Sequence, residues 1–527
     1  MGRSGSKKTG QKKSSTARKD EVGGKELSSS VPGKRPADGK KANGGTRRSD
    51  RDRMSSLKLL VDKPWTRTLL VSALLLVASI IVRLYRLEHP RSVVFDETHF
   101  GKFTDWYLKG EFFFDIHPPL AKMVFAYLGS ALGYELSEVD PYRHIGLRFK
   151  PGDKFLILRG ISAFFGAFVP VFMFLTCEEL DLPLESSLLA TSAVLFEHML
   201  VVESRLILIN SQLMFYLSLS LYFAVRLWKS SQGTPQRWIF LVLTALAATG
   251  AISVKWTAGV TPFVIALVSF FGLLFPHARL TLSECGIAAT IAFSAYTLLH
   301  YLHFKALPNT GQGTPFVSQG FRATLQGSEY YGKVPEASFW SRYYELSQAM
   351  FWLNKGTTKA HPFMSPWYTW PLSTKHMIYA GGIGLPGSGP VKLIVNPGVA
   401  LLTVSAVGIT ILATLLSIRY RDSRLVTNSA KTLHMSAALV AAWILNLLPY
   451  MAVERSAFLY HYLPGLYYAQ ILLGVVVAGL PKVPRRIAAS LMIATIVAAF
   501  INWSPWIYGL AVPRASKWRL NLFDSWY

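Results

Sequence analysis

The chain has 527 residues, of which 51% are hydrophobic and 16% are charged, and its mean hydropathy is +0.30. Soluble domains carry about a quarter charged residues, so this composition excludes an array of soluble globular domains. The net charge of +25 would suit a nucleic-acid binder, but 19 basic and 7 acidic residues in the first 67 positions supply +12 of it, and the rest is diluted through an apolar body. We therefore expect no nucleic-acid partner.

Residues 1–57 form a segment rich in Gly, Ser and Lys with no apolar periodicity. Such a segment buries too little surface to offset its ordering entropy, so we expect a disordered basic arm. The positive-inside rule places this arm in the cytosol, and binding to anionic lipid headgroups is a second role open to it. We expect no signal peptide, because the first apolar run begins only near residue 68.

Eleven apolar runs follow, each close to the length that a bilayer core requires. They lie near residues 68–86, 155–176, 186–202, 206–227, 238–254, 257–275, 282–303, 393–418, 433–452, 460–480 and 487–508. Lys and Arg are concentrated in alternate connecting loops, which supports a cytosolic N-terminus and a C-terminus on the opposite side. The sequence therefore predicts an all-α polytopic membrane protein with about eleven transmembrane helices.

Two long polar segments, 87–154 and 304–392, fall on the non-cytosolic side in this topology. They divide the chain into an N-terminal membrane module over 58–303, which contains the first long loop, a second long loop, and C-terminal helices over 393–527. Long loops between fixed elements commonly carry function. We therefore expect the functional residues in these two segments and at the helix ends on the same face.

The first long loop opens with adjacent carboxylates, Asp96 and Glu97, in the aromatic-rich stretch VVFDETHFGKF. Aromatic residues favour the headgroup interface, so they would hold the carboxylates beside the lipid. Partial desolvation there raises the pKa of a carboxyl group and makes it a better base. His117 and Lys122 are further polar groups expected at this depth, as contacts to an acceptor or to the loop.

Cations recur at helix ends on this same face, although the positive-inside rule would deplete them there. They are Arg159, Arg205, Lys255, Arg455 and His461. Each alone could be a snorkelling anchor, but together with the acidic pair they predict a site for an anionic, lipid-linked substrate, since Arg and Lys are phosphate-binding groups. His361 in the second loop is either a substrate contact or an interfacial histidine.

The sequence contains no Walker A loop, no GxGxxG after a strand and no HExxH, so a nucleotide-sugar fold and an ATP-driven pump are unsupported. Transfer of a sugar from a polyprenyl phosphate needs no nucleotide site. It needs a base for the acceptor and cations for the leaving phosphate, which the residues above supply. Asp96 and Glu97 could also bind a divalent cation, but no further ligand cluster is visible.

The segments FDETHFG and GEFFFDIHPPLAK resemble the first luminal loop of the protein O-mannosyltransferases, glycosyltransferase family 39 of the GT-C membrane fold. RGISAFFG, ESRLILINS, SVKW, VSQGFRATLQG, HPFMSPWYTWPL and ERSAFLYHYLP follow in the family's order. The resemblance implies a dolichyl phosphate mannose donor, Ser and Thr hydroxyls of secretory polypeptides as acceptors, and inversion at the anomeric carbon. It also implies a multi-pass protein of the endoplasmic reticulum membrane, with a cytosolic N-terminus and a luminal C-terminus.

Carried onto this chain, the resemblance makes Asp96 the general base and Glu97 its partner in positioning acceptor or donor. Arg159, Arg205 and Arg455 become candidates for donor binding or for structural ion pairs. The chain departs from the family in two places. Only eleven residues separate Gly327 from Phe339, where eukaryotic members carry a luminal MIR domain, and Asn210 stands where many members have an acidic residue.

Other functions stay open at this stage. The same motifs would serve a GT-C transferase with another polyprenyl-phosphate sugar or acceptor. The chain could also be a non-catalytic subunit paired with a related mannosyltransferase, although the intact acidic pair argues against this, and homo- or heterodimers are both compatible with the sequence. A transporter would be expected to show inverted repeats with broken helices, and none is apparent.

Overall fold

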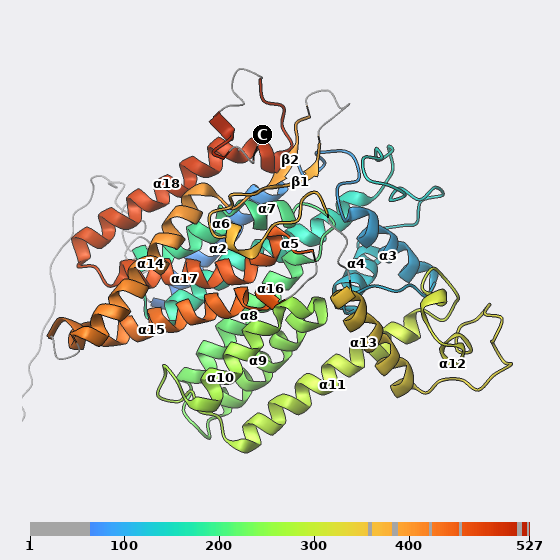
Figure 1. Cartoon of the computed structure of the whole chain (residues 1–527), viewed down its shortest axis with the longest axis horizontal. Helices are drawn as coiled ribbons and strands as arrows, with labels where there is room; N and C mark the ends of the chain where they lie inside the picture. The colour runs from blue at the N-terminus through green and yellow to red at the C-terminus, as the bar shows by residue number, and fades with distance from the viewer. Residues whose placement is uncertain are drawn as a thin grey trace, which may run out of the picture. The chain divides into compact units, whose positions relative to one another are not determined.

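The computed structural model (Figure 1) describes residues 64–356, 361–381, 388–420, 424–452, 456–513, 519–523 and 526. The basic arm predicted over 1–57 lies outside the described residues. From Pro64 onward the chain forms one compact unit. Its elements are predominantly helices, which agrees with the expected fold class.

A helix corresponds to every apolar run that the sequence predicted. In chain order they are α2 (Pro64–Leu84), α5 (Phe155–Glu179), α6 (Leu184–Leu195) with α7 (His198–Glu203), α8 (Asn210–Lys229), α9 (Pro235–Val254), η1 (Trp256–Gly259) with α10 (Val260–Phe271), α11 (Leu282–Ala306), α14 (Pro397–Arg419), α15 (Arg424–Leu447) with α16 (Pro449–Ala452), η4 (Leu459–Tyr462) with α17 (Leu463–Ala478), and α18 (Lys482–Tyr508).

Eight helical segments in the described part of the chain are long and apolar enough to cross a membrane. The segments of α6, α8 and α10 are the other three that were predicted. α6 and α10 have only 12 residues each, and α8 is long enough but carries polar residues along its length. The structure thus supports a multi-pass membrane protein by length and composition, while the number of spans stays between eight and eleven.

The helices pack in two neighbouring groups. α5 contacts α2, α6 and α8, and α8 lies against α9; α17 contacts α14, α15 and α6, with α18 against α6 and α14 (Figure 1). Close approach needs small residues: a Cβ on Gly166 of α5 would lie 2.1 Å from Ser204 Oγ. The polar residues that follow the C-terminal ends of α2, α7 and α9 therefore lie together at one end of the helix bundle.

The first long loop folds into α3 (Glu97–Lys109) and α4 (Leu120–Ala131). The second contains η2 (Thr314–Phe316), α12 (Gln319–Arg322), α13 (Phe339–Gly356) and η3 (Trp367–Thr369). It also contains one antiparallel strand pair, β1 (Met377–Ala380) with β2 (Val391–Leu393), in which Met377 pairs with Leu393. This pair is a small exception to the all-α prediction, and it forms from short β-branched and aromatic runs that favour strands.

Backbone hydrogen bonds join the two long loops. Phe112 N–H donates to Asn309 O at 2.9 Å, and Gly313 N–H donates to Phe112 O at 3.0 Å. A Cβ on Gly311 or Gly313 would lie 2.5 Å from backbone atoms of Phe112 or Phe113. Glycine is therefore needed where the NTGQGTPF stretch crosses the first loop, and the crossing fixes both loops over the same end of the helices.

Candidate active site

Asp96 stands at the start of α3, at the position that would cap the helix. Its side chain makes no capping hydrogen bond, so the carboxylate is not used to satisfy the helix. The preceding residue, Phe95, has a φ of +49°, an unusual conformation for an aromatic residue and one associated with functional sites. Asp96 is half-buried.

Burial raises the pKa of Asp96, and the charge of Asp115 adds to this, whereas His99, Lys255 and His361 lower the pKa again. These five groups come from the first loop, the end of α9 and the second loop. The structure therefore brings Asp96, Lys255 and His361 into one electrostatic neighbourhood, although they are far apart in the sequence.

Glu97 lies beside Asp96 in sequence but points into the protein, where it is fully buried. Arg159 donates to both of its oxygens, from Nε at 2.8 Å and from Nη2 at 2.9 Å. The backbone N–H groups of Val94 and Ile207 donate to it as well, at 2.8 and 3.0 Å. These hydrogen bonds tie the first loop to α5 through Glu97, and its expected role in positioning acceptor or donor stays a prediction.

Arg159 is equally buried and also donates to the carbonyls of Leu87, Pro90 and Ser92. Of the two roles considered for it, the structure places it in the structural ion pair. Arg205 donates to the carbonyls of Arg83, Tyr85 and Arg86 and lies over the ring of Tyr508, with 4.5 Å to the centroid. It therefore satisfies open carbonyls at and just after the C-terminal end of α2.

A cleft of about 660 Å³ opens beside Lys255 at the end of α9. Three of the predicted residues line it: His117, Lys255 and His461. Its other walls come from η1, α10, α13, α15 and α16, with Trp256, Asn354, Lys355 and Tyr450 among them. Lys255 Nζ lies over the ring of Tyr460, 4.6 Å from the centroid. The cleft combines cations, amides and aromatic rings, as expected of a site for a phosphate-linked sugar.

Lys122 and His361 are described by the structure but do not line the cleft. Lys122 is buried, pairs with Asp115 and donates to His117 O at 2.6 Å, so it holds the His117 segment in place. His361 accepts from Phe363 N–H at 3.2 Å and packs edge-on against Phe458. Arg455 falls outside the described residues.

The sequence did not single out Asn354 and Lys355, which reach the cleft from the end of α13. The polar stretch WLNKG, within an aromatic-rich part of the second long loop, is the sequence signal that could have indicated them. Among the residues that the structure describes, no group of three or more His, Cys, Asp or Glu side chains could hold a metal ion.

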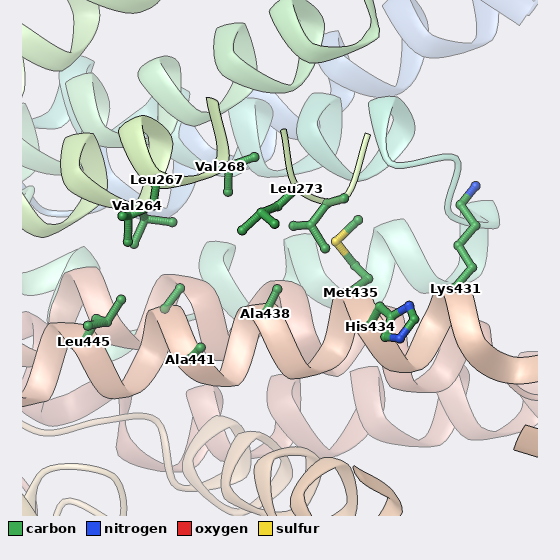
Figure 2. Close-up of a pocket in the computed structure, with 12 residues that line it drawn as sticks. Val264, Leu267, Val268, Leu273, Lys431, His434, Met435, Ala438, Ala441 and Leu445 are labelled. Carbon is green, nitrogen blue, oxygen red and sulfur yellow. The ribbon is translucent and has the colours of Figure 1, made fainter. Parts of the chain in front are cut away.

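An apolar groove of about 700 Å³ runs between α10 and α15 (Figure 2). Val264, Leu267 and Val268 face the small residues Ala438, Ala441 and Ala442, and Lys431 and His434 stand at one end. The groove lies on the same two helices as the cleft: Val260 and Asn446 line the cleft, and Val264 and Leu445 line the groove close by along those helices. The two hollows are therefore neighbours along α10 and α15.

Two sequence models of one family match the chain. Residues 73–308 match "Dolichyl-phosphate-mannose-protein mannosyltransferase", and residues 339–526 match "C-terminal four TMM region of protein-O-mannosyltransferase". Similar curated proteins include dolichyl-phosphate-mannose–protein mannosyltransferase 1 of Saccharomyces cerevisiae, 31% identical over 51% of this chain and 33% of the relative. Protein O-mannosyl-transferase 2 of Danio rerio is 31% identical over 50% of this chain and 36% of the relative.

The matched stretch thus spans about a third of the length of these relatives. Among solved structures, a chain of the S. cerevisiae protein O-mannosyltransferase Pmt1–Pmt2 complex bound to the sugar donor superposes with a TM-score of 0.80 at 18% identity. The match covers 89% of this chain and 94% of that one. The likeness shows that the fold is the GT-C fold. The two matched sequence models, which together span most of the chain, show that it belongs to the protein O-mannosyltransferase family.

Proposed function

We propose that the protein transfers mannose from dolichyl phosphate mannose to Ser and Thr hydroxyls of secretory-pathway polypeptides. The observation that carries this proposal is the half-buried Asp96 carboxylate, unused by its own helix, in the electrostatic neighbourhood of Lys255, which lines the cleft. The names of the relatives and the donor-bound relative support the choice of donor. The sugar and phosphate would occupy the cleft, and the polyprenyl chain would lie in the groove.

The chemistry then follows as a single displacement. Asp96 accepts the proton of the acceptor's Ser or Thr hydroxyl while the oxygen of that hydroxyl attacks the anomeric carbon of mannose. The bond from that carbon to the phosphate oxygen breaks, and dolichyl phosphate leaves with the bonding electrons. Lys255 and His461 line the cleft, where their charges would bind the donor phosphate in the ground state and stay paired with it in the leaving dolichyl phosphate. One base and one displacement give inversion.

The groove gives a test of the donor's lipid tail. Ala441→Phe would fill the space between α10 and α15, so we expect the KM for dolichyl phosphate mannose to rise severalfold with little change in kcat. A water-soluble donor analogue with a short prenyl chain should be unaffected. Leu412→Phe on the exposed face of α14 is the matched control. An Ala441→Phe protein with an unchanged KM for the long-chain donor would show that the tail lies elsewhere.

The pH dependence of transfer follows from the environment of Asp96. Because burial raises the pKa of Asp96 above that of an ordinary aspartate, activity should be present at higher pH and fall as the pH drops through this raised value. The charge of His99 lowers the pKa of Asp96, so His99→Gln should move the acid limb of kcat/KM to higher pH. A limb that stays in place, or moves to lower pH, would argue that Asp96 is not the titrating base.

We also propose the membrane setting and organisation expected from the sequence: residence in the endoplasmic reticulum membrane, Asp96 and the cleft on the luminal side, and pairing with a related mannosyltransferase. The supporting solved relative is a two-chain complex. Assays of microsomes should include the protein alone and together with a paralogue. The decisive assay measures transfer from a panel of polyprenyl-phosphate sugars to peptide and lipid acceptors. Transfer of another sugar, or to lipid alone, would contradict the proposed activity.

A further inference from the structure

Glu203 is a fully buried carboxylate at the end of α7, and the mechanism above does not use it. Its two oxygens have different partners. Oε1 accepts a hydrogen bond from the hydroxyl of Tyr379 on β1, and Oε2 accepts one from Asn210 Nδ2 at 3.1 Å. A buried carboxylate with one donor on each oxygen can hold two separate structures in fixed positions at once.

The Tyr379 side leads to the base. The Tyr379 ring stacks on Phe95, with centroids 4.4 Å apart and an angle of 12° between planes. Phe95 is the residue with φ of +49° that immediately precedes Asp96. A non-glycine residue keeps such a conformation only when its surroundings enforce it. The hydrogen bond to Glu203 fixes the Tyr379 ring, and this ring supports the backbone turn that presents Asp96.

The Asn210 side leads to the cation. Asn210 Oδ1 lies 3.5 Å from Lys255 Nζ, while its Nδ2 is the group bound to Glu203. Lys255 lies over the ring of Tyr460, and this ring contacts Phe95 at a centroid distance of 6.4 Å. The contacts form a closed ring of six side chains: Glu203, Tyr379, Phe95, Tyr460, Lys255 and Asn210.

We propose that Glu203 is a positioning residue that holds Asp96 through Tyr379 and Lys255 through Asn210, so that base and phosphate-binding cation keep a fixed relation across the site. The inference rests on the proposed function for the roles of Asp96 and Lys255. It also accounts for the amide at position 210. An amide donates to Glu203 and accepts from Lys255, whereas a carboxylate there would repel Glu203 and pair with the cation meant for the donor.

Steady-state kinetics can distinguish the contacts through Tyr379 from the contacts through Asn210. Tyr379→Phe keeps the stacked ring but removes the hydroxyl, so kcat should fall roughly tenfold, the effect of one hydrogen bond to a charged group, with an unchanged KM for the donor. Asn210→Leu keeps the volume but removes both hydrogen bonds, so the donor KM should rise with little change in kcat. Glu203→Gln should change both constants.

Tyr134→Phe is the matched control, because Tyr134 also donates to a buried carboxylate, that of Asp105, at 2.7 Å within the same luminal loop. Both kinetic constants should be unchanged in this variant. A purely structural role for Glu203 would instead lower the amount of folded protein and leave the remaining kcat and KM alike in all variants. That outcome, or equal effects of Tyr379→Phe and Asn210→Leu on the same constant, would overturn the inference.

A second measurement does not depend on donor identity. Hydrogen exchange of the backbone over residues 93–99 should be faster in Tyr379→Phe than in the wild-type protein and unchanged in Tyr134→Phe. These amides are protected by local hydrogen bonds such as Glu97 N–H to Val94 O at 3.0 Å. Unchanged exchange in Tyr379→Phe would contradict the support of Asp96 by Tyr379 even if the protein used a different sugar donor, so the two hypotheses can fail separately.

Discussion

Asp96→Asn should abolish mannose transfer without loss of folded protein. General base catalysis contributes roughly 10²–10⁴-fold to rates, so we expect at least a hundredfold fall in kcat. Asparagine has the same shape, and the Asp96 side chain caps no helix, so the melting temperature in detergent should not change. The measurement is transfer of labelled mannose from dolichyl phosphate mannose to a Ser/Thr-rich peptide.

Asp153→Asn provides the control for this experiment. Asp153 lies in the same first long loop, where its carboxylate accepts a hydrogen bond from Lys150 N–H at 2.5 Å within a turn, and it does not line the cleft. It should retain wild-type transfer. Full activity in Asp96→Asn would show that another group removes the hydroxyl proton, and the mechanism proposed here would have to be abandoned.

Arg159→Met is expected to destabilise the protein rather than change its chemistry. The substitution leaves the fully buried Glu97 carboxylate without its cation, and breaking a buried pair in this way costs about 3–5 kcal/mol. That is a large part of the roughly 5–15 kcal/mol stability of a typical domain. In detergent, Arg159→Met should lose its folded state at a clearly lower temperature than the wild-type protein. Size-exclusion chromatography after heating measures the folded fraction.

Arg67→Met is a useful comparison for this loss, because Arg67 pairs with Glu178 at 3.1 Å while half-exposed. Exposed pairs contribute about 0–1 kcal/mol, so the unfolding temperature should barely change. The double variant Glu97→Gln with Arg159→Met should recover part of the stability lost in Arg159→Met, since no buried charge is left unpaired. If Arg159→Met kept its stability but lost donor binding, the donor-binding role considered from the sequence would be restored.

The location of Asp96 was predictable from the sequence, because a short run of local features places it: an apolar helix, an aromatic interface and a loop start. The pairing of Glu97 with Arg159 was not, because 62 positions separate them and any of several cations could have met either carboxylate. Arg205 shows the same limit. Its charge at a helix end was visible, but the open carbonyls of α2 that it satisfies come from another part of the chain.

A helix lies in each predicted apolar run, but hydropathy missed the break between α6 and α7, where the sequence reads as one run over 186–202. Glu197 makes this break. Its carboxylate accepts from Met199 N–H at the start of α7 and from Asn396 N–H at the start of α14. Tyr379 was equally invisible, since it lies in a segment interpreted as loop and becomes part of the site only through contacts with Glu203 and Phe95.

The crossing of the two long loops has a consequence for how the chain tolerates additions. The stretch from Gly327 to Phe339 is a run of turns whose base is closed by Ala337 N–H donating to Gly320 O at 2.9 Å. Chain on both sides is already pinned, by the glycines before it and by Phe339 packed on Phe304 behind it. A folded module whose own ends lie close together could be grafted at Gly332 at the modest entropic cost of a longer loop. We therefore expect a domain inserted at Gly332 to leave the cleft and Asp96 undisturbed.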